Sequence, residues 1–164
     1  MRANYASLNY TFRQRFDVPA KQAFDWCTDF QSTDGKFFGN QTRRSVRWLD
    51  KDTAILTDTS YPDGRRRRIR RLVRIDPESL SWTNTHLDGP FRHSQYWYRI
   101  VPAGARRSAL EFSGFRLIRA TRSLSPAKIA RLANAERTED STMWRNRIAP
   151  GLERDLQGPS SRRH

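Results

Sequence analysis

Apolar and polar residues alternate along the first part of the chain. The apolar face of this run is formed by Leu8, Tyr10, Phe12, Phe16 and Val18. A period of two is typical of a strand with one buried face. Pro19 then suits the first turn of a helix, because its missing N–H is unpaired there in any case. The pattern predicts a strand over 8–18, a short helix over 20–27, and a second short helix from Asp29 or Ser32 as an option.

The middle of the chain is a series of strand-like runs separated by turn residues. These runs cover residues 42–49, 53–61, 66–75, 80–87, 91–102 and 108–119. Pro62-Asp63-Gly64 and Asp88-Gly89-Pro90 are strong turn signals between them. Because the connections have hairpin length, these runs and the first strand predict a seven-stranded antiparallel sheet.

The last part of the chain is predicted to form one long helix over 125–157. Ser125 supplies a capping hydroxyl, and Pro126 stands at the favoured first helical position. Its later apolar face is formed by Trp144, Ile148, Leu152 and Leu156. Pro150-Gly151 is predicted to kink or split the helix, and residues 159–164 are predicted to be a disordered basic tail. The order of elements predicts an α+β fold, a single domain over 1–158, in which a curved sheet wraps around the last helix and leaves a cavity.

Composition adds a strong positive charge to this picture. The 164 residues carry 31 Lys and Arg against 17 Asp and Glu, a net charge of +14. Such a surface attracts polyanions, although a general preference for arginine over lysine is an alternative source of part of the excess. Cys27 is the only cysteine, so no intrachain disulfide can form. No secretory signal or membrane-spanning run is recognisable, and we expect a cytoplasmic protein.

Three segments carry a resemblance to a known superfamily. They are 12–20, with its Val18-Pro19-Ala20 step out of the strand, 24–30, and the terminal helical segment 144–156. Together they resemble the SRPBCC superfamily, also called START-like or helix-grip proteins, which includes polyketide cyclase/dehydrase-like proteins. The resemblance implies a helix-grip fold that binds apolar or amphipathic small molecules between sheet and helix. It implies no catalytic residue, because the superfamily has no universal catalytic motif.

Our first functional hypothesis is non-catalytic binding or transport of a hydrophobic or amphipathic small molecule in that cavity. The candidate lining residues are Tyr10, Phe12, Trp82, Tyr96, Tyr98, Phe112, Met143 and Trp144. Arg71, Asn84 and His86 are the polar groups expected to orient the ligand. If the face of Ile69 and Val73 points inward, Arg71 lies in the cavity and can pair with an acidic ligand group or with Glu111.

The second hypothesis is a cyclase- or hydrolase-type enzyme on the same scaffold. His86 and His93 flank the Asp88-Gly89-Pro90 turn, and Glu111 is expected on a neighbouring strand. Two imidazoles and a carboxylate are suited to general acid–base catalysis. The alternative is a pair of exposed hairpin histidines. There is no second cysteine and no His-x-x-x-His pattern, so we expect neither a metal site nor a cofactor.

The third hypothesis is weak binding of nucleic acid or of an anionic membrane through an arginine-rich sheet face. The candidate residues are Arg13, Arg15, Arg66, Arg68, Arg70 and Arg74. Aromatic residues next to arginines on a sheet can stack single-stranded bases, although the spacing of an RNP motif is missing. A solvated charged face is the alternative interpretation. The oligomeric state stays open.

Overall fold

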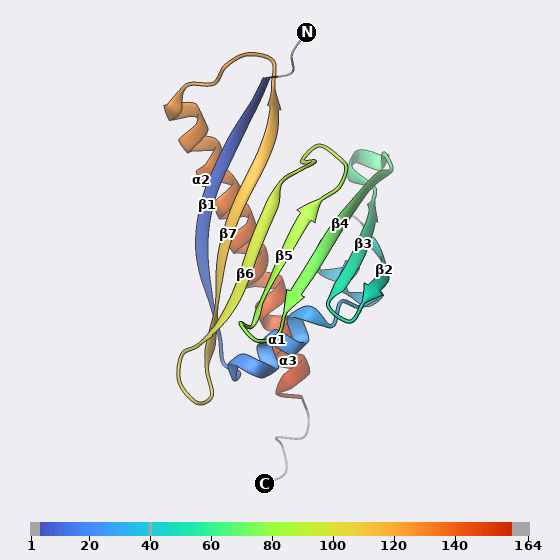
Figure 1. Ribbon diagram of the computed structural model, residues 1–164, viewed down its shortest axis with the longest axis vertical. Helices are drawn as coiled ribbons and strands as arrows, with labels where there is room; N and C mark the ends of the chain where they lie inside the picture. The colour runs from blue at the N-terminus through green and yellow to red at the C-terminus, as the bar shows by residue number, and fades with distance from the viewer. Residues whose placement is uncertain (1–3, 40, 159–164) are drawn as a thin grey trace.

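A seven-stranded antiparallel sheet is the frame of the computed structural model, which describes residues 4–39 and 41–158 (Figure 1). The predicted tail at 159–164 lies outside the described residues. The strands are β1 (Asn4–Phe16), β2 (Arg43–Asp50), β3 (Thr53–Ser60), β4 (Arg67–Asp76), β5 (Ser81–His86), β6 (Gln95–Pro102) and β7 (Ser108–Ala120). Their order in the sheet is β1-β7-β6-β5-β4-β3-β2, so the predicted seven antiparallel strands are confirmed.

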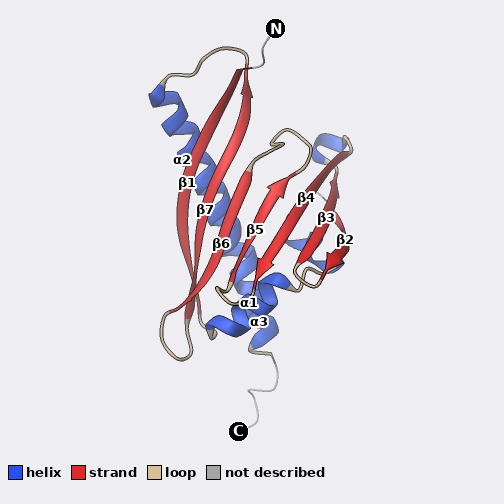
Figure 2. Ribbon diagram, in the orientation of Figure 1, coloured by secondary structure: helices blue, strands red, loops and turns tan. Residues whose placement is uncertain are grey.

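Helices lie against the inner face of this sheet (Figure 2). After β1 come α1 (Ala20–Thr28) and a short 3-10 helix, η1 (Ser32–Phe37), and a further 3-10 turn, η2 (Pro62–Gly64), joins β3 to β4. The long terminal helix consists of α2 (Pro126–Met143), a π-helical turn η3 (Trp144–Ile148) and α3 (Ala149–Leu156), 31 residues in all. The helix-grip layout expected from the sequence is therefore present. None of the described helices is long and apolar enough to cross a membrane.

The terminal helix is not split at Pro150, so one of the two outcomes expected from the sequence, a split, does not occur. Pro150 has no N–H to donate, and its ring would crowd the carbonyl of Asn146 in a regular α-helix. The turn just before it is wider instead, because the N–H of Ala149 donates to the carbonyl of Trp144, five residues back. This π turn accommodates the proline, and the helix continues to Leu156.

The closely packed part of the core lies at one end of the sheet, where α1 and α3 meet β1, β6 and β7. Its most deeply buried side chains include Phe16, Ile100, Leu110 and Leu152. Along α2, by contrast, Ala133 is the one residue that is buried among those described. The helix is thus packed into the core at its C-terminal end, while α2 runs along β1 and leaves space between the helix and the central strands.

The predicted strand over 91–102 was too long at its start, because β6 begins at Gln95. Residues 90–93 form turns, and His93 adopts a positive φ of 71° that does not belong to a strand. Ser94 fixes the end of the turn, since its fully buried hydroxyl accepts a 2.9 Å hydrogen bond from the N–H of Leu117. An apolar residue at the start of the run, Phe91, had made the turn resemble a strand.

Gly151 provides a test of the packing between the terminal helix and η1. A Cβ at this position would lie 2.6 Å from Cε1 of Phe37, whose ring is buried. We expect Gly151→Ala to lower the free energy of unfolding by about 1–2 kcal/mol, because the overlap outweighs the gain of about 1 kcal/mol in helix propensity. Urea unfolding measures this change. Gly158→Ala, where a Cβ meets ordinary contacts, is the matched control, and an unchanged or raised stability of Gly151→Ala would contradict the packing.

Candidate functional site

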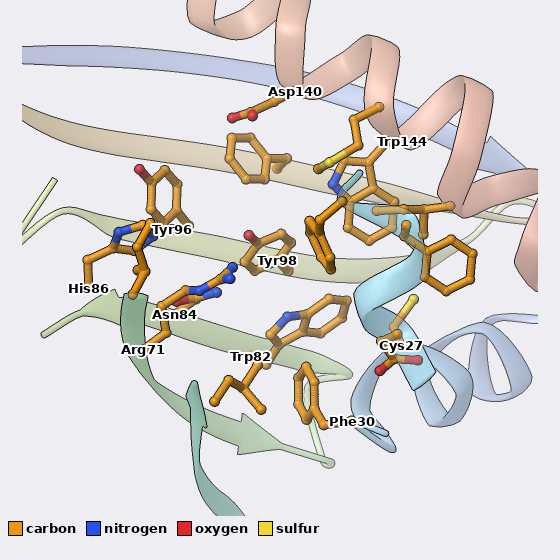
Figure 3. A pocket seen from close by; sticks show the side chains of 18 of the residues that line it. Cys27, Phe30, Arg71, Trp82, Asn84, His86, Tyr96, Tyr98, Asp140 and Trp144 are labelled. Carbon is orange, nitrogen blue, oxygen red and sulfur yellow. The ribbon is translucent and has the colours of Figure 1, made fainter. Parts of the chain in front are cut away.

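A cavity of about 350 Å³ lies between the inner face of the sheet and the terminal helix (Figure 3). The sheet contributes one wall, α1 and η1 close one side, and Met143, Trp144 and Ile148 of the long helix cover it. This volume lies in the range of pockets that bind small molecules. The cavity predicted from the order of elements is therefore present in the structure.

Aromatic side chains make up the sheet wall of the cavity. Strand register places Tyr98 on β6 directly between Trp82 on β5 and Phe112 on β7. The rings of Trp82 and Tyr98 are stacked, with centroids 4.8 Å apart and an interplanar angle of 1°. The ring of Tyr98 also contacts Phe112 edge-on, with centroids 5.1 Å apart. The ring centroid of Trp144, on the helix, lies 6.1 Å from that of Tyr98. The alternation along three adjacent strands therefore produces a continuous apolar surface suited to a ring-bearing ligand.

The opposite end of the cavity is polar. Arg71 on β4 and His86 on β5 are register partners, and Asn84 lies two residues before His86 on the same inner face. Figure 3 shows these three side chains grouped on one side of the cavity, below Tyr96 and Tyr98. Arg71 Nε, Asn84 Oδ1 and His86 Nδ1 are buried and have no hydrogen-bond partner within the described protein. Buried polar atoms are nearly always paired, so this group is suited to bonds with a bound molecule or with water.

A shared carboxylate holds the cationic groups at this end. Asp58 on β3 accepts two hydrogen bonds from Arg44, at 2.8 and 2.9 Å, and one from Nη2 of Arg71. Arg44 has Asp34 as a second carboxylate at 3.7 Å, and the ring of Phe38 lies against both guanidinium groups. Burial, followed by the repulsion from Arg44, lowers the pKa of Arg71 to about 10, so Arg71 stays charged at neutral pH.

His86 is a neutral imidazole in this setting. Burial lowers its pKa to about 3, and the positive charges of Arg71 and Arg116 act in the same direction. Its ring packs against Tyr96, with centroids 5.2 Å apart. At physiological pH His86 therefore offers one donor and one acceptor without a charge.

A second polar cluster attaches α2 to the sheet beside the cavity. Tyr10 on β1 donates a 2.6 Å hydrogen bond to Asp140 of α2. Arg116 on β7 donates a 2.9 Å hydrogen bond to the hydroxyl of Tyr96. Its guanidinium group is also ion-paired with Glu136 and lies 3.7 Å from the carboxylate of Asp140. Burial is the main reason why the pKa values of Tyr10 and Asp140 are both raised. This cluster fixes the helix where apolar packing is sparse.

Most of the predicted ligand-binding residues contribute to the cavity wall. Those that do are Arg71, Trp82, Asn84, His86, Tyr96, Tyr98, Phe112, Met143 and Trp144. Tyr10 and Phe12 are not among the lining residues: Tyr10 is bonded to Asp140, and Phe12 stacks on Phe112 at 4.4 Å. Arg71 points inward as expected, but its carboxylate partner is Asp58 instead of Glu111.

The side chains of the three residues in the catalytic hypothesis do not form one cluster. His86 is buried in the cavity, His93 is exposed in the turn after β5, and Glu111 is exposed on the outer face of β7, 3.7 Å from Arg13. The backbones of the two histidines do meet, because the N–H of His93 donates a 2.9 Å hydrogen bond to the carbonyl of His86, but the side chain of His93 is exposed while that of His86 is buried. Among the described residues, no cluster of His, Cys, Asp or Glu side chains has the arrangement of a metal site.

Several cavity residues were missed at the sequence level. Trp26, Phe30 and Phe38 of the α1–η1 region line the cavity, yet the sequence around residues 36–40 shows no clear period. Arg116 was also missed, although its place two positions after Gly114 and four after Phe112 puts it on the inner face of β7. The alternation along β7 was the signal that could have revealed it.

Solved structures with the same architecture place this fold among the helix-grip proteins. The structure is similar to the Zhui aromatase/cyclase from Streptomyces sp. R1128, with a TM-score of 0.75 and 14% identity over 94% of this chain and 99% of that chain. Norcoclaurine synthase from Thalictrum flavum, in complex with dopamine and hydroxybenzaldehyde, gives a TM-score of 0.68 and 9% identity over 93% and 88% of the two chains. A START superfamily protein from Mycobacterium smegmatis gives 0.65 and 12% over 90% and 98%.

These identities show the fold alone. No protein-family model matches the chain, and no curated protein matches its sequence. The helix-grip scaffold typically binds hydrophobic ligands, and its members include both binding proteins and enzymes. The comparisons therefore confirm the helix-grip fold that the resemblance implied, and the choice between binding and catalysis depends on the residues of the cavity.

The burial of neutral His86 predicts a specific dependence of stability on pH. The pKa of His86 is lower in the folded state, so the unfolded chain binds the extra proton and stability falls as pH drops from about 6.5 towards 3. Between about pH 7.5 and about pH 4.5, we expect the free energy of unfolding to fall by about 2–3 kcal/mol more in the wild type than in His86→Gln.

Urea unfolding at the two pH values measures the difference. His93→Gln, at the exposed histidine, is the control and should behave like the wild type. Parallel pH profiles for wild type and His86→Gln would show that His86 is not buried as a neutral group.

Proposed function

We propose that this protein binds a compact, ring-bearing small molecule with a polar acceptor group, and that it does so without catalysis. The observation that carries the proposal is the set of three buried, unpartnered polar atoms on Arg71, Asn84 and His86 beside the aromatic wall. A purely apolar ligand would leave these atoms unpaired, which costs about 1–3 kcal/mol for each group. A ligand that reaches them gains both affinity and a fixed orientation.

The hydrogen-bonding capacity of these atoms defines the complementary ligand. Nε of Arg71 can only donate, so it requires an acceptor such as a carboxylate, sulfonate, phenolate or carbonyl oxygen. Oδ1 of Asn84 can only accept, so a neighbouring hydroxyl or amine on the ligand suits it. Neutral His86 can serve either type of group, depending on its tautomer. The aromatic rings of Trp82, Tyr98 and Trp144 then contact the apolar body of the ligand.

A second candidate is proton transfer at a carbonyl ligand in the same cavity. It is favoured by the position of His86 next to a charged guanidinium, where His86 would take a proton next to the carbonyl and Arg71 would stabilise the enolate oxygen. The low pKa of His86, about 3, makes it a weak base at neutral pH, far from the value suited to a general base. Neither His93 nor Glu111 lines the cavity to assist it. Binding without catalysis is therefore the proposal that the residues support better.

A pair of fluorescent probes with one skeleton tests the role of Arg71. Anilinonaphthalene sulfonate carries an anionic acceptor, and phenylnaphthylamine has the same rings without it. We expect Arg71→Gln to weaken binding of the sulfonate probe by about tenfold and binding of the neutral probe by less than about twofold, because only the sulfonate accepts a charge-assisted bond from Arg71. Fluorescence titration measures both affinities.

Arg74→Gln is the matched control for this experiment. Arg74 lies three residues further along β4 on the outer face, so its loss removes the same charge outside the cavity. Equal losses for the two variants would place the sulfonate on the basic surface and refute the role of Arg71. Failure of both probes to bind the wild type would refute an open cavity.

A further inference from the structure

The outer face of the sheet has a composition that the cavity does not explain. Strand register places Trp97 on β6 between Thr83 on β5 and Ser113 on β7, all on the face opposite the terminal helix. The two neighbours are short, so the indole projects beyond them and is 57% exposed. Phe115, also exposed, is the diagonal neighbour of Trp97 across the β6–β7 pair, at roughly 7–8 Å. Two exposed aromatic rings thus lie close together beside short polar side chains on the outer face.

Arginines surround these rings. Arg99 follows Trp97 by two residues on the same strand, and Arg74 lies in the same cross-strand row, one position beyond Thr83. Both side chains are exposed and have no ion-pair partner among the residues that the structure describes. On the outer face, the exposed strand arginines without a described ion pair are Arg15, Arg43, Arg47, Arg68, Arg74, Arg99 and Arg119. The outer face is therefore a cationic surface with an accessible aromatic centre.

The same register clarifies the basic residues singled out in the sequence. Arg13 and Arg15 lie on β1 while Arg68, Arg70 and Arg74 lie on β4, so about 19 Å separates the two groups at about 4.8 Å per strand. Trp97 and Arg99 on β6 lie between them and join them into one surface. Arg13 and Arg70 contribute less charge, because Glu111 and Asp88 are their ion-pair partners. Arg66 precedes β4 and is not part of the strand face.

We propose that the outer face binds single-stranded nucleic acid, with bases stacked on Trp97 and phosphates held by Arg74 and Arg99. Base–aromatic stacking with a cationic surround is the usual basis of sequence-tolerant binding to single strands. An open depression, whose lining includes Thr11, Arg13, Trp97, Arg99, Glu111 and Ser113, leaves room for a planar base beside the indole, and its one carboxylate, Glu111, is paired with Arg13. An anionic membrane fits less well, because Phe115 is the one apolar neighbour of Trp97 across these strand pairs, and the others are polar or charged side chains that do not form an apolar patch.

The test uses the intact protein and fluorescein-labelled oligonucleotides of about 16 nucleotides, one of DNA and one of RNA. Fluorescence anisotropy at salt concentrations from about 50 mM to about 200 mM gives the affinity and its salt dependence. We expect Trp97→Ala to weaken binding by about tenfold. The double variant Arg74→Gln/Arg99→Gln should make the slope of log affinity against log salt shallower by roughly 1.4, the value for two lost phosphate contacts on a single strand.

Matched controls separate this surface from general charge. Trp48 on β2 is 44% exposed, so Trp48→Ala removes an exposed indole elsewhere and should leave the affinity unchanged. Arg131→Gln/Arg137→Gln removes two exposed arginines from α2 and should leave the slope close to that of the wild type. A preference for DNA or for RNA identifies the natural strand, and both outcomes support the surface.

Three results would overturn the proposal. They are no binding by the wild type at about 150 mM salt, equal effects of the Trp97 and Trp48 variants, and binding to vesicles of anionic lipid that depends on Trp97 while the oligonucleotides do not bind. Circular dichroism confirms that each variant is folded, which is expected because all the substituted side chains are exposed.

Discussion

Asp58 holds two arginines on the inner face of the sheet, and the polar character of the cavity depends on this carboxylate. A guanidinium group is costly to bury without a partner, and desolvation lowers the pKa of both Arg44 and Arg71 even here. The carboxylate is shared unequally, since Arg44 donates two hydrogen bonds to Asp58 and is also close to Asp34, while Arg71 donates one to Asp58. Arg71 consequently keeps donor capacity towards the cavity.

The two faces of the sheet serve different environments through a single alternating pattern. On β6, Tyr96 and Tyr98 point into the cavity. The residues that follow each of them, Trp97 and Arg99, point to solvent. On β4, Arg71 is bonded within the protein and Arg74 is free of any described ion pair. Successive side chains of a strand point to opposite faces of the sheet. Nearby residues of the same type can therefore belong to separate sites.

Much of the fold could be predicted from the sequence because local signals agreed with one another. Alternation identified the strands, and Ser125-Pro126 marked the start of the long helix, where the Ser125 side chain does accept a bond from the N–H of Lys128. The carboxylate partner of Arg71 could not be predicted, because it depends on how β3 and β4 align, and periodicity along one strand does not fix register between strands. The π turn before Pro150 was missed for a similar reason: a proline signals that the regular helix cannot continue unchanged, but not how the backbone adapts.

The aromatic wall has a consequence for observing the protein. Trp26, Trp82 and Trp144 all line the cavity, and Trp82 is stacked on Tyr98. The near-ultraviolet emission of the protein therefore originates in large part from the surface that a ligand would touch. A ring-bearing molecule in the cavity would quench that emission or receive its energy, so the protein carries its own optical reporter of occupancy and needs no attached dye.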